Sequence, residues 1–307
     1  MNSAGIDLST VTEDGGPKGL GVAESRSGEA SAVALRSASL SFGPRTLWRG
    51  LDLDIRPGEF FAVLGPNGSG KTSFLKVLLG LLPLTSGSAL VAGRPPGSGG
   101  GEVGYIPQQK GFGSDVPLRA RDLVGLGIDG HRWGVRVRRR ETDAEIRRLL
   151  DRVGASGYAN VPVGQLSGGE LQRLRVAQAV AGDPAVLLCD EPLLALDLNH
   201  QQAVSALIDQ QRSETGAAVV FVTHEINPIL DYVDRVLYLA QGEFRVGSPE
   251  EVMTTEVLSE LYGSRVEVSR VNGRIVVLGL PDATTHLHHV HDQPALALDQ
   301  HAEEDAT

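Results

Sequence analysis

Apolar positions follow two patterns along the first third of the chain, and both predict β-strands. Residues 32–40 and 47–55 alternate apolar with polar side chains, which is typical of strands with one buried face. Residues 60–65 are continuously apolar up to a glycine, which predicts a central strand buried on both faces. A short helix and two further strands are expected after it, over 71–81, 86–92 and 101–106.

The middle of the chain, from Pro117 to Val180, has a helical pattern. Within it, residues 143–154 place four apolar side chains on one helix face, those of Ile146, Leu149, Leu150 and Val153. Gly154 then provides a favourable helix stop. A helical subdomain is therefore expected over about 117–180.

Strands and helices alternate again from residue 185. Strands are expected at 185–190, 217–224 and 235–240, with a helix over roughly 198–213 and a short helix between the last two strands. This alternation favours a mainly parallel sheet that is covered on both sides. The helical subdomain would then be an insertion in an α/β fold.

The two ends of the chain differ from this folded part. Residues 265–279 predict a β-hairpin turned at Asn272-Gly273, because Asn-Gly between alternating segments is a strong turn signal. Residues 1–31 contain few apolar side chains and many breakers, which predicts a disordered tail. Residues 281–307 form a second, acidic and His-containing tail that is also expected to be disordered. One domain over 32–280 is expected between the tails.

The formal net charge of −10 comes almost entirely from the tails. Residues 281–307 carry six acidic and no basic side chains, and residues 1–31 carry five acidic and two basic ones. This leaves about −1 for residues 32–280. A nearly neutral domain argues against the phosphate-binding basic surface of a nucleic-acid-binding protein.

Composition also limits the expected location. No apolar run approaches the roughly 18 residues of a membrane span, and the first thirty residues lack the basic start and apolar stretch of a signal peptide. Cys189 is the one cysteine, so no internal disulfide can form. These features predict a cytoplasmic protein.

The strongest chemical signal is the sequence GPNGSGKT at Gly65–Thr72, which fits the phosphate-binding template of Gly, four residues, and Gly-Lys-Ser/Thr. It lies between a buried strand and a predicted helix start, where backbone N–H groups favour phosphate. Lys71 would reach the β- and γ-phosphates, and the Thr72 hydroxyl would ligate Mg²⁺. The alternative is a glycine-rich turn with an accidental lysine. The predicted ATP-binding residues here are Gly65, Pro66, Asn67, Gly68, Ser69, Gly70, Lys71, Thr72 and Ser73.

A second, acidic element follows the apolar run at 185–189. It places Asp190 at the carboxyl end of a buried strand, where ligands of open parallel sheets bind, and Glu191 comes next. Asp190 would hold Mg²⁺, and Glu191 would polarise the attacking water as a general base. An Asp-Glu pair alone could equally be the start of a solvated loop.

The sequence LSGGELQR, which begins at Leu166, resembles the signature of the ATP-binding cassette (ABC) ATPases. The signature residues are Leu166, Ser167, Gly168, Gly169 and Glu170, with Glu170 in place of the usual glutamine. By resemblance, this turn contacts the γ-phosphate of ATP held by a second copy, so two chains close head-to-tail over two nucleotides. The same residues also predict an N-capped helix, with Ser167 as the cap.

The resemblance assigns further roles in order along residues 32–280. Gln108 matches the glutamine that senses Mg²⁺ and couples the nucleotide to a membrane partner, Asp197 matches the aspartate at the dimer interface, and His224 matches the histidine on the γ-phosphate. Phe42 lies where the family usually has a tyrosine stacked on adenine. The metal ligands implied are Thr72, Gln108 and Asp190. The fold implied is an α/β P-loop NTPase of the RecA-like type, with an N-terminal antiparallel β-subdomain and an inserted helical signature subdomain.

The resemblance implies the ATP-hydrolysing subunit of an ABC transporter, bound at the cytoplasmic face of the plasma membrane to separate membrane subunits. Residues 223–263 resemble the branch that takes up zinc and manganese, which implies an extracytoplasmic metal-binding protein as a further partner. The alternatives are a transporter for another substrate and a non-transport cassette ATPase that acts on nucleic acid or ribosomes. The tail histidines could bind Zn²⁺ or have no function; they are His286, His288, His289, His291 and His301.

Overall fold

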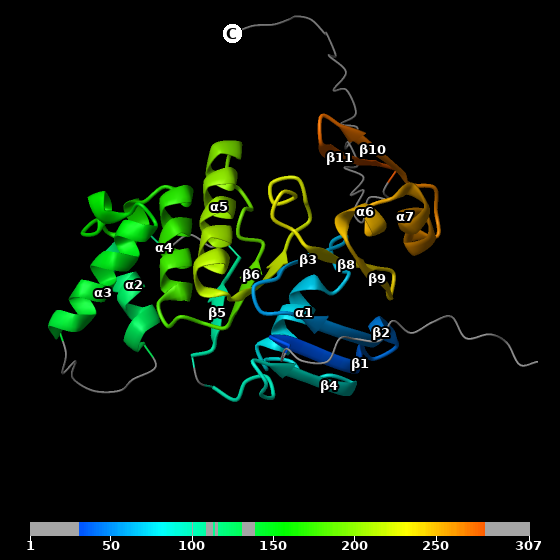
Figure 1. Ribbon diagram of the computed structural model, residues 1–307, viewed down its shortest axis with the longest axis horizontal. Helices are drawn as coiled ribbons and strands as arrows, with labels where there is room; N and C mark the ends of the chain where they lie inside the picture. The colour runs from blue at the N-terminus through cyan, green and yellow to red at the C-terminus, as the bar shows by residue number, and fades with distance from the viewer. Residues whose placement is uncertain (1–30, 100, 109–112, 114–115, 131–138, 280–307) are drawn as a thin grey trace, which may run out of the picture.

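The computed structural model describes residues 31–99, 101–108, 113, 116–130 and 139–279. At its centre is a six-stranded sheet in the order β5-β6-β7-β3-β8-β9 (Figure 1). Its strands are β3 (Phe60–Leu64), β5 (Val103–Ile106), β6 (Val186–Asp190), β7 (Ala218–Val222), β8 (Arg235–Ala240) and β9 (Glu243–Gly247). All neighbouring strands are parallel except β8 and β9.

The continuously apolar runs are the central strands of this sheet. Every residue of β3, β6 and β7 is buried. Such strands bury both faces, so their side chains need not alternate. The parallel arrangement brings the carboxyl ends of β3, β6 and β7 to the same edge of the sheet, and the predicted α/β fold is confirmed.

A second, antiparallel sheet has the order β2-β1-β4. It consists of β1 (Val33–Phe42), β2 (Arg45–Ile55) and β4 (Ser86–Val91). Its apolar side chains pack with those of the central sheet and of helix α1 (Lys71–Leu78) in one core. Trp48 of β2 meets Phe74 of α1 edge-on, with ring centroids 6.0 Å apart. This contact holds the first turn of α1 against the N-terminal sheet.

The helical region lies at the opposite end of the molecule from the N-terminal sheet (Figure 1). It contains α2 (Ala120–Asp129), α3 (Arg139–Arg152) and α4 (Gly168–Val180), with α5 (Leu198–Thr215) between it and the sheet strands. Short 3₁₀ turns at Ser156–Tyr158 and Val163–Gln165 precede α4. The predicted apolar face of α3 is buried, and Gly154 follows the helix with a φ of 66°.

The C-terminal part adds two helices and a hairpin. Helices α6 (Pro249–Val252) and α7 (Thr255–Tyr262) follow β9, and the sequence pattern had predicted none of these three elements. Strands β10 (Glu267–Val271) and β11 (Arg274–Leu278) form an antiparallel pair. Asn272 and Gly273 have φ values of 51° and 78°, the left-handed pair that a two-residue turn of this type requires.

The prediction of a short helix between 224 and 235 is wrong, because this segment forms turns. Its backbone bonds are of the i to i−3 type, from Ile229 to Ile226 and from Tyr232 to Ile229. Within this segment, the side-chain amide of Asn227 exchanges two hydrogen bonds with the backbone of Ile275 in β11, at 2.9 and 2.8 Å. Pro228 disfavours a helical backbone at Asn227, and the contact with β11 anchors the turns that form instead.

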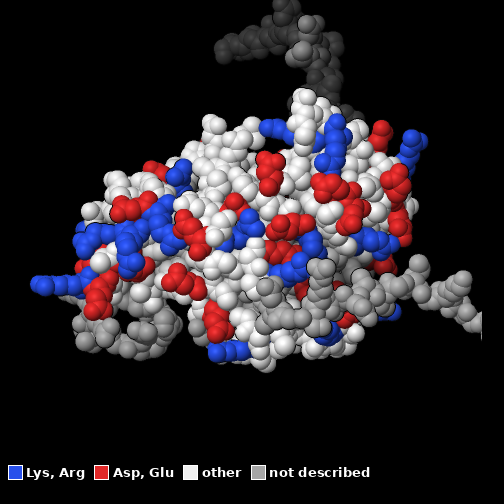
Figure 2. All heavy atoms as spheres, in the orientation of Figure 1, with Lys and Arg blue, Asp and Glu red and all other residues white. Residues whose placement is uncertain are grey.

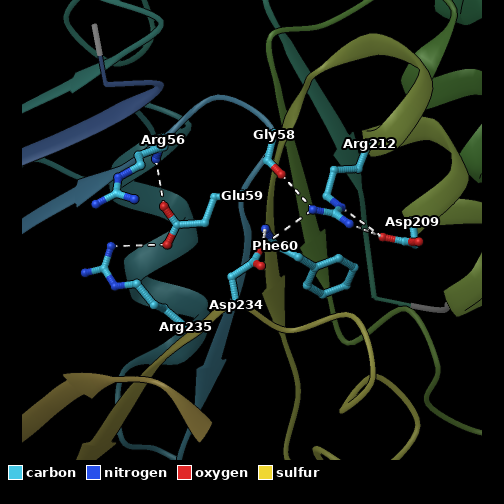
Figure 3. A network of polar contacts seen from close by, with 8 residues as sticks. All are labelled: Arg56, Gly58, Glu59, Phe60, Asp209, Arg212, Asp234 and Arg235. Carbon is cyan, nitrogen blue, oxygen red and sulfur yellow. Dashed lines mark hydrogen bonds and ion pairs between the residues drawn. The ribbon is translucent and has the colours of Figure 1, made fainter. Parts of the chain in front are cut away.

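A polar network joins the amino-terminal ends of β3 and β8 to the end of α5 (Figure 3). Arg212 of α5 donates to the Gly58 carbonyl at 2.8 Å and to Asp209 at 2.8 Å, and lies 3.5 Å from Asp234. Asp234 also accepts the Phe60 backbone N–H at 2.8 Å. A neighbouring carboxylate, that of Glu59, accepts from Arg235 and from the Arg56 backbone.

We expect Arg212→Ala to lower the free energy of unfolding by about 2 kcal/mol, because charged hydrogen-bond partners lose their donor. Arg270→Ala is the control: its ion pair with Glu250 is 3.6 Å long and exposed, and should contribute about 0.5 kcal/mol or less. Urea unfolding of both variants measures the difference. Equal effects would show that the network does not stabilise this end of the sheet.

Charge and hydropathy add two observations. Figure 2 shows basic and acidic side chains intermixed over the face in view, with the basic ones densest at the end where α2 and α3 lie. No helix within the described ranges is both long and apolar enough to cross a membrane.

Candidate nucleotide site

The phosphate loop connects the end of β3 to α1, and its glycines fit this sharp path. Gly65 has a φ of 141°, and a Cβ there would lie 2.1 Å from the Leu239 carbonyl oxygen of the neighbouring strand. Gly70 has a φ of 108° and caps α1. Only glycine allows the backbone at position 65 to approach the Leu239 carbonyl so closely.

Lys71 is the first residue of α1, and its side chain turns back to this loop. The side chain is 5% exposed, and its Nζ donates to the carbonyl oxygens of Gly65 at 2.7 Å and Pro66 at 3.1 Å. Burial lowers the pKa of Lys71, while the charges of Glu191 and Asp190 oppose this shift. The Ser69 hydroxyl is buried without a hydrogen-bond partner. A buried ammonium and an unpartnered hydroxyl on one loop fit an incoming phosphate.

An open hollow of about 400 Å³ lies beside the loop. Most of the predicted ATP-binding residues line it together with Glu191, and so do two residues that were not predicted, Arg45 and Leu47. The predicted residues on its wall are Phe42, Asn67, Gly68, Gly70, Lys71, Thr72 and Ser73. Phe42 is 50% exposed, so its ring face is open to a stacking partner.

The acidic pair stands at the carboxyl end of β6. The Thr72 hydroxyl lies 3.4 Å from Asp190 Oδ1, which brings two hard oxygen donors together. Burial, and then the charge of Glu191, raise the pKa of Asp190 above its ordinary value. A cation bound here would offset that cost, so Thr72 and Asp190 fit Mg²⁺ that arrives with a triphosphate.

Glu191 has a left-handed backbone, with a φ of 45°, and its N–H donates to the Val222 carbonyl of β7 at 3.0 Å. Strain of this kind persists where surrounding structure enforces it, often at functional sites. Gln108 donates to Glu191 Oε2 at 3.2 Å, so its hydrogen bond goes to the predicted base rather than to Thr72 or Asp190. Glu191 and His224 also line a second hollow of about 90 Å³ with Gln201.

Two polar residues of the site were not predicted from the sequence. The Tyr105 hydroxyl lies 3.5 Å from Asp190 Oδ2, because β5 pairs with β6 in parallel. Arg45, opposite Phe42 at the β1–β2 turn, donates to the Gly68 carbonyl at 2.7 Å. The sequence contains one indication of Tyr105, because this residue lies on the predicted strand that leads to Gln108. Only the order of the strands in the sheet shows that Tyr105 is a neighbour of Asp190.

The signature residues begin α4 and form a capping box. Ser167 N–H and Oγ donate to Glu170 Oε2 at 2.9 and 2.8 Å, and Glu170 N–H donates back to Ser167 Oγ at 3.3 Å. These bonds lower the pKa of Glu170. Neither hollow described above has a lining residue from 166–170. The signature is therefore built as an N-terminus but does not line the nucleotide hollow of its own chain.

Asp197 begins α5. Its carboxylate is exposed and accepts the His200 backbone N–H at 2.9 Å, which with the His200 ring lowers the pKa of Asp197. Neither hollow has Asp197 on its wall. The tail histidines lie outside the described residues.

Comparison with known proteins decides the family. The family described as ABC transporter matches residues 48–194. The chain is 36% identical over 233 residues to the zinc import ATP-binding protein ZnuC of Yersinia pestis, which covers 76% of this chain and 85% of that protein. The chain belongs to the ABC transporter ATPases. It is thus an ATP-binding protein that hydrolyses ATP to drive transport.

Two further relatives agree with this membership. This ABC ATPase is 31% identical over 235 residues to the manganese transport system ATP-binding protein MntB of Bacillus subtilis (strain 168), covering 76% of the chain and 93% of the relative. A solved inward-facing structure of a putative metal-chelate type ABC transporter superposes with a TM-score of 0.69 at 25% identity, over 81% of this chain and 96% of the other.

We expect Asp190→Asn to abolish Mg²⁺-dependent ATP turnover while making the nucleotide-free ABC ATPase more stable. The raised pKa means that the folded state holds the Asp190 proton more tightly than the unfolded state does. Stability is therefore lost as pH rises from the unfolded pKa through the folded one, and at neutral pH the ionised group destabilises the fold. A neutral amide removes this loss, so the melting temperature should rise by about 2–4 °C.

Asp231→Asn, at an exposed position in the turns after β7, is the control and should change neither property. Thermal melting in the absence of nucleotide measures the stability. Phosphate release in the presence of MgATP measures the turnover. An Asp190→Asn protein that melts at or below the wild-type temperature would contradict the electrostatic argument.

Proposed function

We propose that this chain is the ATP-hydrolysing subunit of an importer for a divalent metal ion, zinc or manganese. The support is that relatives covering most of the chain are named for zinc import and manganese transport. Separate integral membrane subunits would form the pathway, and an extracytoplasmic metal-binding protein would deliver the ion. The chain would act at the cytoplasmic face of the plasma membrane.

We infer that two copies hold ATP between them. The observation that carries this proposal is that the signature 166–170 does not line the hollow of its own phosphate loop. A second copy, placed head-to-tail, would bring its signature N-terminus to the γ-phosphate, where backbone N–H groups favour negative charge. Asp197 would lie at the interface of the two copies.

We propose the following roles for the site residues, and the contacts described above support them. Lys71 and the loop residues Gly65, Pro66, Asn67, Gly68, Ser69, Gly70 and Ser73 would bind the phosphates, and Phe42 would stack on adenine. Thr72, Asp190 and Gln108 would hold Mg²⁺, which neutralises developing charge on the phosphates. Glu191 would polarise the attacking water, oriented by its contact with Gln108, and His224 would contact the γ-phosphate.

Transport is tested with the membrane subunits that co-purify with the full chain. Reconstituted in lipid vesicles with the binding protein, the complex should hydrolyse ATP faster when Zn²⁺ or Mn²⁺ is present, and should accumulate that ion. Stimulation by a lipid, a peptide or an organic solute instead would support another substrate. Activity that depends on ribosomes or nucleic acid would favour the non-transport alternative.

A further inference from the structure

His200, in the first turn of α5, bridges two segments of the proposed interface. Its Nδ1 lies 2.7 Å from Asp197 Oδ2, while its backbone N–H donates to Asp197 Oδ1 at 2.9 Å. An ionised carboxylate only accepts hydrogen bonds, so Nδ1 carries the proton in this contact. The Asp197 carboxylate is thus held at both oxygens by one residue.

The other edge of the His200 ring lies against the signature. A Cβ added to Gly169 would lie 2.1 Å from His200 Cδ2 and 2.8 Å from Nε2. Gly169 is buried, whereas the His200 side chain is 42% exposed. Gly169 has an ordinary helical backbone, since its φ is not in the left-handed region. The ring of His200, and not the backbone conformation, is therefore what a side chain at this signature position would meet.

These contacts place one imidazole between two helix N-termini, those of α4 and α5. The carboxylates nearest to it are those of Asp197 on its own helix and Glu170 on α4. Glu170 in turn caps α4 through Ser167. The signature turn, His200 and Asp197 form one connected unit.

We propose that His200 is a positioning residue that fixes the signature turn relative to Asp197, so that both meet the second copy and its ATP in one geometry. This inference rests on the proposed ATP-sandwich dimer. It adds His200 to the residues proposed for the dimer interface, and His200 does not line the nucleotide hollow of its own chain. Loss of His200 should therefore weaken the closing of the dimer and leave ATP binding to a single chain unchanged.

The test uses the full chain with Glu191→Gln, in which ATP should trap the dimer. Light scattering during an ATP titration gives the concentration for half-maximal dimer, and a fluorescent ATP analogue gives the affinity of the single chain. His200→Ala should raise the first by about tenfold, the effect of losing one hydrogen bond to a charged group, and leave the second unchanged. His200→Asn, which keeps an amide donor for Asp197, should recover most of the loss. Gln202→Ala, exposed on the same helix, is the control.

The outcomes separate the two claims. A His200→Ala protein that dimerises at the parent's ATP concentration overturns the positioning role while the ATP-sandwich dimer stands. A parent that never dimerises overturns both. Equal losses in His200→Ala and His200→Asn would also contradict the role assigned to the Nδ1 contact.

The packing contact has its own test in the single chain. Gly169→Ala should lower the melting temperature because its Cβ meets the imidazole, and His200→Ala in the same protein should restore most of it. Additive losses in the double variant would show that the ring does not lie against Gly169, and the proposal would fail on its geometry.

Discussion

Glu191→Gln should lower ATP turnover by about 10²-fold or more, the usual contribution of a general base. The amide keeps the size of the side chain and can still accept from Gln108, but it cannot take a proton from water. The left-handed backbone at Glu191 is held by the bond to Val222, which the substitution leaves in place. ATP affinity should therefore stay close to that of the wild type.

Phosphate release and binding of a fluorescent ATP analogue separate these effects. Glu225→Gln is the matched control, since Glu225 is an exposed acid that borders the second hollow, one residue past His224. It should keep most of the turnover. If the Glu191→Gln protein kept more than about a tenth of it, Glu191 would not be the base.

Gly65→Ala should lower the free energy of unfolding by about 3–5 kcal/mol and abolish ATP binding. Two costs add: a φ of 141° strains any L side chain, and the new Cβ would lie 2.1 Å from the Leu239 carbonyl oxygen. The loop must move away from β8 to relieve the contact. That movement would disturb the carbonyls of Gly65 and Pro66 that hold Lys71.

Gly93→Ala isolates the conformational cost, because Gly93 has a φ of 74° but no atom within 4 Å of an added Cβ. We expect a loss of about 1 kcal/mol there and normal ATP binding. Chemical unfolding and ATP titration measure both variants. Similar losses at the two glycines would show that the contact with Leu239 is unimportant.

The parts of the fold and site predicted from sequence are those encoded by local patterns. The phosphate loop, the acidic pair after β6 and the capped signature helix each combine a strand or helix boundary with residues of suitable chemistry. Buried strands at 60–64, 186–190 and 218–222 were clear because each is a continuous apolar run, which ends at Asp190 in the second strand. The parallel topology then predicts that the carboxyl ends of these strands lie at the same edge of the sheet.

The remaining features depend on contacts between distant segments. The turns that stand where a helix was predicted after His224 are tied by Asn227 to β11, 48 residues away. Tyr105 reaches Asp190 only through the pairing of β5 with β6. Likewise, nothing near His200 in the sequence indicates that its ring lies on Gly169. Periodicity and propensity describe neighbours along the chain, so they do not predict such pairs.

The most direct test of the central claim is the mass and nucleotide content of the Glu191→Gln protein at saturating MgATP. Analytical ultracentrifugation with labelled ATP measures both. A shared site predicts a species of twice the chain's mass that holds two ATP molecules and is lost when Ser167 is replaced by a bulky residue. A single chain that binds ATP yet stays at its own mass, also with its membrane subunits present, would contradict it.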